Sequence, residues 1–156
     1  MNVFVLHTDP RIAAEMHCDK HCVKMIVESC QILSTVMHHH GVTGPYKPSH
    51  AKHPCVLWAA KSRSNFDWLM SLLRGLLDEY TLRYGKRHSC EDIYPQLINP
   101  VPSDLGLTPF ALAMPDQYRC DDPVASYRAY YLGDKAYFAK WRNGRVPDWF
   151  RNKEIR

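Results

Sequence analysis

Acidic and basic side chains recur at one-turn spacing between His17 and Gln31, in a pattern suited to acid–base or amine chemistry. Lys24 and Glu28 are four residues apart, as are Lys20 and Lys24, so a helix would place all three on one ridge. Two close lysines disfavour each other's charged form, and a neutral lysine amine can attack carbon and form a Schiff base. A neighbouring carboxylate would then take or deliver protons.

Asp19 adds a second candidate acid, because it falls on the apolar stripe of the same segment. A carboxylate that faces a core is costly unless a partner satisfies it. This placement favours a functional role for the ridge. The alternative is a solvated Lys–Glu ridge without chemistry, which accounts for most such pairs in proteins.

Two further places carry candidate residues. His53 precedes Pro54, which favours an extended backbone at the mouth of a following helix, where anions bind well. It is either a phosphate or proton-transfer ligand or a simple loop cap. Glu79 and Arg83 form a pair at helical spacing. We assign catalytic roles to Asp19, Lys24, Glu28 and His53, and substrate-binding roles to His17, Lys20, His21, Gln31, Glu79 and Arg83.

The histidines and cysteines of this region have a spacing that only loosely resembles a metal site. His17 and His21 are one turn apart, and Cys18 and Cys22 share that spacing, but no Cys-x-x-Cys pair occurs. The neighbouring lysines would repel a cation. We therefore expect no metal and no other cofactor.

A helical scaffold must position these residues. Apolar residues at three–four spacing, including Ile12 and Val23, predict a first helix over residues 11–37. Asp9 or Thr8 would cap it, with Pro10 in its first turn. The apolar run at residues 2–6 predicts a short buried strand before it.

The rest of the chain predicts further helices. They are expected from about Pro54, over residues 65–84 with Gly85 as the stop, over 91–98, and over 121–132 with Gly133 as the stop. The prediction is a mainly α fold in a single domain, residues 1–156, with at most a short strand element at the N-terminus. Its C-terminal segment, residues 142–156, is basic and aromatic. Together with the residues just before it, this tail is the best candidate for a surface that contacts DNA phosphates: Lys135, Lys140, Trp141, Arg142, Arg145, Trp149, Phe150, Arg151 and Lys153.

Composition limits the partners and the compartment. The net charge of +4 permits nucleic-acid binding without demanding it. No secretory or transmembrane run is present, and the six cysteines fit reduced, buried thiols. We expect a cytoplasmic protein without a membrane partner, and the sequence leaves its oligomeric state open.

Several motifs match a known family. They are residues 2–6, 18–25, 31–33 and 53–55, Glu28, residues 78–80, 107–111 and 114–116, and the pair Asp122-Pro123. With them the chain resembles a family of small bacteriophage proteins over nearly its whole length. More distantly it resembles bacterial proteins of the pyrimidine-dimer DNA glycosylase type, through Asn2, Asp19, Lys20, Lys24, Glu28, Gln31, His53-Pro54 and Glu79.

The resemblance implies a DNA repair or modification enzyme that removes a pyrimidine base. The phage enzyme of this type uses the amine of a small residue exposed after Met1 is removed, with a glutamate beside it. Asn2 departs from that pattern, because it predicts that Met1 is retained. We therefore expect Lys24 or Lys20 to replace the amine, or Asp19 or Glu28 to activate water instead.

Three functions follow from these observations. The first is a phage-encoded base-excision enzyme that acts on a pyrimidine in DNA after extruding it from the stack. The second is a hydrolase or transferase for a free nucleotide or nucleoside. The third is a non-enzymatic accessory protein in which Asp19, Lys24 and Glu28 form a structural network.

Overall fold

A computed structural model describes residues 1–153, and this part of the chain is helical, with no β-strand. The helices are α1 (Pro10–Met16), α2 (Asp19–His39), α3 (Pro54–Lys61), α4 (Arg63–Tyr84), α5 (Pro123–Tyr130) and α6 (Asp148–Arg151). Short 3-10 turns occur at η1 (Ser89–Glu91), η2 (Tyr94–Gln96) and η3 (Asp116–Tyr118), and a π-helical turn, η4 (Tyr131–Lys135), follows α5. The predicted mainly α class is confirmed.

The first predicted helix is in fact two, because the backbone is extended at His17 and Cys18. The prediction of one helix was wrong because side chains, not the next helical turn, satisfy the carbonyls at the end of α1. Arg83 donates to the carbonyls of Glu15 and His17 at 3.0 and 2.8 Å. Asp9 caps α1 as predicted, accepting from Arg11 N and Ile12 N. Two positions of the predicted stripe, Ile12 and Val23, are more than a third exposed.

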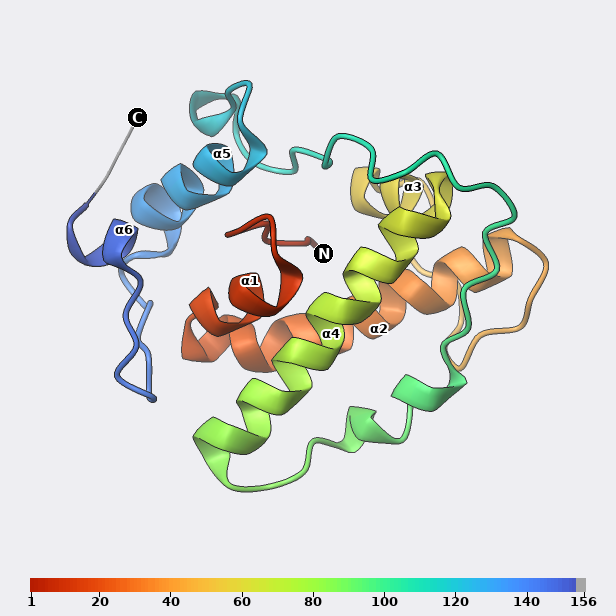
Figure 1. Cartoon of the computed structure of the whole chain (residues 1–156), viewed down its shortest axis with the longest axis horizontal. Helices are drawn as coiled ribbons and strands as arrows, with labels where there is room; N and C mark the ends of the chain where they lie inside the picture. Colours follow the sequence, from red (N-terminus) through yellow and green to blue (C-terminus); the bar gives the residue numbers. More distant parts are fainter. Residues whose placement is uncertain (154–156) are drawn as a thin grey trace.

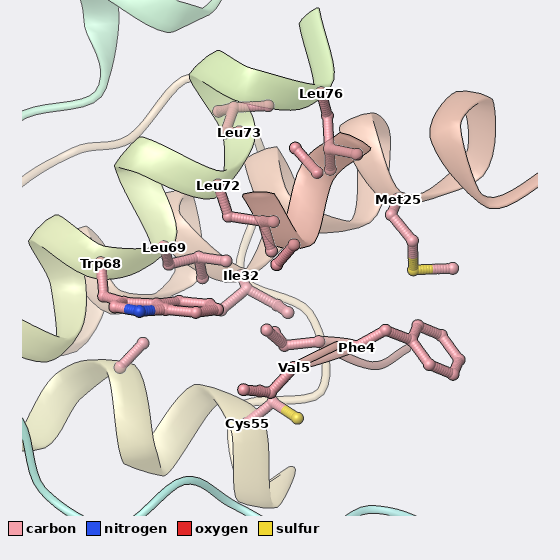
Figure 2. Close-up of a cluster of buried hydrophobic side chains, with 14 of the residues drawn as sticks. Phe4, Val5, Met25, Ile32, Cys55, Trp68, Leu69, Leu72, Leu73 and Leu76 are labelled. Atoms are coloured by element: carbon pink, nitrogen blue, oxygen red, sulfur yellow. The ribbon is translucent and has the colours of Figure 1, made fainter. Parts of the chain in front are cut away.

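The segment before α1 is buried but does not form the predicted strand. Figure 1 shows this segment turning through the middle of the view just before α1. Its residues 3–6 are almost completely buried. Figure 2 places Val5 beside Cys55 of α3, with Ile32 of α2 nearby. Packing against helices and side-chain hydrogen bonds replace a neighbouring strand.

The core is formed mainly where α4 packs against α1 and α2. Leu69, Leu72, Leu73 and Leu76 of α4 are completely or almost completely buried in it (Figure 2). Each such side chain contributes about 1.5–3 kcal/mol by leaving water. Gly75 allows the close approach of α1, because a Cβ there would lie 2.7 Å from the Cβ of Ala14. Gly85 ends α4 in the left-handed conformation, as predicted.

The second half of the chain differs from the prediction in two places. The helix expected over 91–98 is a pair of 3-10 turns, η1 and η2. Gly133 does not end α5, because the chain continues through it as η4, where a Cβ would collide with Tyr118. The segment 142–156 extends beyond the described residues at 154–156, and within it Trp149 is buried against the core.

The cysteines are free thiols, and five of the six are buried as small apolar side chains. Burial raises the pKa of Cys22 to about 12 and that of Cys55 to about 11. These thiols therefore stay protonated and pack rather than react. Within residues 1–153, no helix combines the length and the apolar character needed to cross a bilayer.

Candidate active site

A polar pocket of about 130 Å³ opens where the N-terminal segment, α2, α5 and η4 meet. Its lining residues are Met1, Asn2, Phe4, His21, Lys24, Met25, Glu28, Tyr130 and Lys135. Three of the predicted site residues, His21, Lys24 and Glu28, are therefore brought together. A cavity of about 150 Å³ holds one benzene ring, so this pocket has room for a single ring or sugar.

Glu28 is the only carboxylate among the lining residues, and nitrogen atoms surround it. Its Oε1 lies 3.4 Å from the amino group of Met1 and accepts a hydrogen bond from the backbone N–H of Asn2 at 3.1 Å. Its Oε2 lies 3.7 Å from Nζ of Lys24. Only 13% of the Glu28 side chain is exposed, compared with 62% for Lys24. A shielded carboxylate thus lies between two amines.

The side chain of Asn2 fixes the first residues against Glu28. Its Nδ2 donates to the carbonyl of Ala113 at 2.8 Å. Its Oδ1 accepts from the backbone N–H of Val3 at 2.7 Å and from the hydroxyl of Tyr127 at 3.3 Å. Because these partners come from distant parts of the chain, the amino group of Met1 is held in place by the fold rather than by local sequence.

His21 forms a wall of the pocket but does not titrate near neutral pH. Its ring stacks on Phe4 with 4.3 Å between centroids, and its Nδ1 lies 2.6 Å from the hydroxyl of Tyr131. Burial, followed by the charges of His17 and three lysines, lowers the pKa of His21 to about 2. The neutral ring can position a ligand through hydrogen bonds, but it is a poor proton donor.

His53 lies next to Met1, at the N-terminus of α3 as predicted. Its Nδ1 accepts from the backbone N–H of Cys55 at 3.1 Å, and its ring also hydrogen-bonds to the backbone of Met1. Burial lowers the pKa of His53, and the positive amino terminus and His50 lower it further. His53 therefore supports the amino-terminal residue from the N-terminus of α3.

Three predicted site residues, Asp19, Glu79 and Arg83, lie in a different cluster together with Asn143 and Arg145. We call these five residues the closed cluster. Arg83 donates to Oε1 of Glu79 at 2.9 Å and to Oδ1 of Asp19 at 3.1 Å, and its side chain is completely buried. Arg145 binds Oε2 of Glu79 at 2.9 Å, and Asn143 donates to Oε1 at 3.1 Å. Asp19 and Glu28 are nine residues apart on α2, roughly 13 Å along its axis.

The remaining predicted residues surround the pocket without lining it. The Nζ of Lys20 lies over the ring of Phe138, 4.7 Å from its centroid. His17 is completely buried, with its Nδ1 2.7 Å from the carbonyl of Ala13 and no partner for its Nε2. Gln31 is half-buried one turn beyond Glu28, and its carbonyl accepts from Thr35 at 2.8 Å.

Sequence reasoning missed the residues that reach the pocket from outside α2. The amino group of Met1 was set aside because Asn2 predicts its retention, although the polar Asn2 at the head of an apolar run could have indicated an anchored N-terminus. The sequence leaves Tyr130 open between a core residue and a base-stacking residue, and it includes Lys135 in a phosphate-contacting tail, but it places neither of them beside Glu28. Residues 1–153 contain no group of three metal-binding side chains close enough to hold an ion.

One of three comparisons with known proteins gives a match. No curated protein and no solved structure matches the chain. A family model described as pyrimidine dimer DNA glycosylase matches residues 1–92, a span that includes Met1, Lys24, Glu28 and His53. Because that match covers more than half of the 156 residues, the chain belongs to the pyrimidine dimer DNA glycosylase family.

Proposed function

We propose that this protein excises a pyrimidine base from DNA through an imine formed on an amine beside Glu28. One observation carries the proposal: two amines, those of Met1 and Lys24, lie within 3.7 Å of the Glu28 carboxylate in a pocket sized for one ring. The family match supports DNA as the substrate. An amine next to a proton-accepting carboxylate is the combination that nucleophilic displacement at a sugar carbon requires.

The amino group of Met1 is the better nucleophile of the two. The side chain of Met1 is only 3% exposed, whereas that of Lys24 is 62% exposed. The fold also anchors this end of the chain, because the side chain of Asn2 donates to Ala113 and accepts from Tyr127. Removal of Met1 would expose the nitrogen of Asn2, which already donates to Glu28 at 3.1 Å. Either form therefore presents an amine to the same carboxylate.

The proposed steps balance as follows. The amine nitrogen attacks C1′ of the target nucleotide, and the bond from C1′ to the base breaks, so that the base leaves with the bonding electrons and takes a proton from solvent. Glu28 accepts the proton lost by the amine and delivers it to the sugar ring oxygen. The ring then opens, and the C1′–N bond becomes an imine. Lys24 stabilises the ionised form of Glu28 between these proton transfers.

Borohydride trapping on a duplex with a single abasic site tests the amine, because the abasic aldehyde forms the same imine without a base to remove. We expect a covalent adduct that maps, after proteolysis and mass spectrometry, to the peptide beginning at Met1 or Asn2. Lys24→Met should still form it. An adduct on Lys24 that is absent from Lys24→Met would instead assign the nucleophile to that lysine. No adduct with the unmodified protein would overturn the imine mechanism.

Pyrimidine specificity needs its own measurement. Duplexes that carry a pyrimidine dimer, a single damaged pyrimidine or no lesion should be compared for base release under single-turnover conditions. Release from a pyrimidine lesion, with none from the undamaged duplex, supports the proposal. Release only from free pyrimidine nucleosides would replace it with nucleoside hydrolysis.

A further inference from the structure

Part of the pocket comes from the portion of the chain beyond the family match. The match ends at residue 92, yet Tyr130 and Lys135 line the pocket together with Glu28. They come from α5 and from the π-helical turn η4. Short π-helical turns are rare and often occur at functional sites. The family match therefore does not account for the role of Lys135 in the pocket.

Packing fixes the position of η4 against the first turns of α2. Tyr131 is completely buried, and its hydroxyl lies 2.6 Å from Nδ1 of His21 and 3.3 Å from the backbone nitrogen of Cys18. Phe138, three residues after η4, contacts the ring of His21 with 5.4 Å between centroids. Lys135 is thus carried by an anchored turn and is not a lysine on a free loop.

The pocket and its rim carry more positive than negative charge. Glu28 is the only carboxylate of the lining, and it already faces both Met1 and Lys24. Neither Lys20 nor Lys135 takes part in an ion pair within residues 1–153; Lys135 lies over the ring of Tyr130, 4.8 Å from its centroid. The adjacent Asp134 instead accepts a hydrogen bond from Tyr118 at 2.7 Å.

The positive charges of Lys135, Lys24 and Lys20 all reach the ring of His21 in the pocket wall. Burial is the main cause of the lowered pKa of His21, and the charges of His17, Lys135, Lys24 and Lys20 lower it further. Cations held close together repel one another, and a bound anion removes that repulsion. In a DNA-binding pocket the available anion is a backbone phosphate.

We propose that Lys135, assisted by Lys20 on the first turn of α2, holds a DNA phosphate that flanks the nucleotide whose sugar enters the pocket. The proposal rests on the proposed function, because it assumes that the sugar lies at Glu28. A lysine binds phosphate as a point charge and needs no fixed bidentate geometry. This phosphate subsite would align the sugar carbon with the amine, so that the C-terminal third of the chain completes a site whose reacting groups lie in the first 28 residues.

Binding to an uncleavable duplex tests the subsite independently of the chemistry. The duplex carries a tetrahydrofuran analogue of an abasic site, and its affinity is measured by fluorescence anisotropy over a range of salt concentrations. We expect Lys135→Met to reduce the slope of log affinity against log salt by about 1. Lys135→Arg should restore most of the slope. Lys86→Met, which removes an exposed lysine just beyond the end of α4, is the matched control and should change the slope little.

Neutral methylphosphonates placed one at a time near the analogue identify the phosphate. At one flanking position, neutralising the phosphate should weaken DNA binding by the unmodified protein several-fold. It should leave DNA binding by Lys135→Met unchanged, as a coupled pair requires. If Lys135→Met and Lys86→Met change the salt slope equally, or if no phosphate position shows coupling, the proposed phosphate subsite is rejected. Absence of DNA binding by the unmodified protein would overturn it as well. Binding with normal coupling but no borohydride adduct would leave the subsite standing and reject the imine mechanism alone.

Discussion

Two glutamates, the half-buried Glu28 and the buried Glu79, each have cations as partners but are held in opposite ways. Glu79 receives four hydrogen bonds from Arg83, Asn143 and Arg145, with distances from 2.9 to 3.2 Å. Glu28 receives one backbone hydrogen bond, and its two amine partners lie farther away, at 3.4 and 3.7 Å. Glu79 is saturated within the fold, whereas Glu28 opens onto a pocket.

The difference teaches how to distinguish a structural carboxylate from a reactive one. Arg83 of the closed cluster also donates to the carbonyls that end α1, so the cluster joins α1, α2, α4 and the segment around Arg145. Each charged side chain in it already has an ion-pair partner within the fold. Glu28 keeps loosely held amines that can exchange protons with a ligand. We therefore assign stability to the closed cluster and chemistry to Glu28.

The largest expected effect is that of Glu28→Gln. The amide keeps the shape and can still accept from the backbone of Asn2, but it cannot take a proton from an amine. We expect single-turnover base release to fall by about 10²–10⁴-fold, the usual contribution of a general base. Unfolding in urea should change by less than about 1 kcal/mol.

The matched control is Glu79→Gln, which should behave in the opposite way. It removes a charge that Arg83 and Arg145 both face, so the free energy of unfolding should fall while base release per folded molecule is retained. If Glu79→Gln loses activity and Glu28→Gln does not, the assignment of roles to the two glutamates is reversed.

Arg83→Met tests the closed cluster at its centre. The guanidinium is completely buried and is shared by Glu79, Asp19 and two backbone carbonyls. Removing one partner of a buried ion pair costs about 3–5 kcal/mol, because the other charge stays buried without compensation. Urea unfolding followed by circular dichroism would measure that loss. A change below 1 kcal/mol would show that the cluster contributes little to stability.

The ridge on α2 was predictable from the sequence, and so was the meeting of Lys24 with Glu28. Both follow from helical periodicity, which is a local property. Periodicity could not show that Asp19 belongs to another cluster, because Arg83 reaches it from α4, 64 residues away. It also could not reveal the break at His17, since that break is stabilised by the same distant arginine.

The amino terminus was the harder part of the site to foresee. Its position depends on Ala113 and Tyr127, which bind the side chain of Asn2 from more than 100 residues away. The π-helical turn that carries Lys135 was equally hidden, because Gly133 is normally a signal for the end of a helix. Such contacts between distant residues require the three-dimensional structure.

Acidification should have a smaller effect, a loss of folding stability through protonation of the buried His17. Burial, as the main cause, lowers the pKa of His17 to about 4, below the ordinary value of 6.5. Between these values the unfolded chain binds the proton that the folded protein excludes, so stability is full above pH 6.5 and falls as the pH drops toward 4. From pH 7 to pH 5, His17 alone should cost about 2 kcal/mol.

The variant His17→Leu separates this contribution from that of other titrating groups. The substitution removes one hydrogen bond, between Nδ1 of His17 and the carbonyl of Ala13, because Nε2 has no hydrogen-bond partner. Urea unfolding at pH 7 and pH 5 should show a smaller loss of stability on acidification than in the unmodified protein. An identical pH dependence would mean that His17 is not the group responsible.

The smallest expected effect, that of Asp19→Asn, sharpens the boundary between the two glutamate sites. Asp19 lies on the same helix as Glu28, yet its Oδ1 accepts from Arg83 at 3.1 Å and from the backbone of Arg142 at 2.9 Å. The asparagine keeps both hydrogen bonds and removes only a charge that is 23% exposed, so we expect a loss of about 1 kcal/mol in unfolding. Base release and borohydride trapping should stay within twofold of the unmodified protein. A drop comparable to that of Glu28→Gln would instead place Asp19 in the reaction and join the two regions into one site.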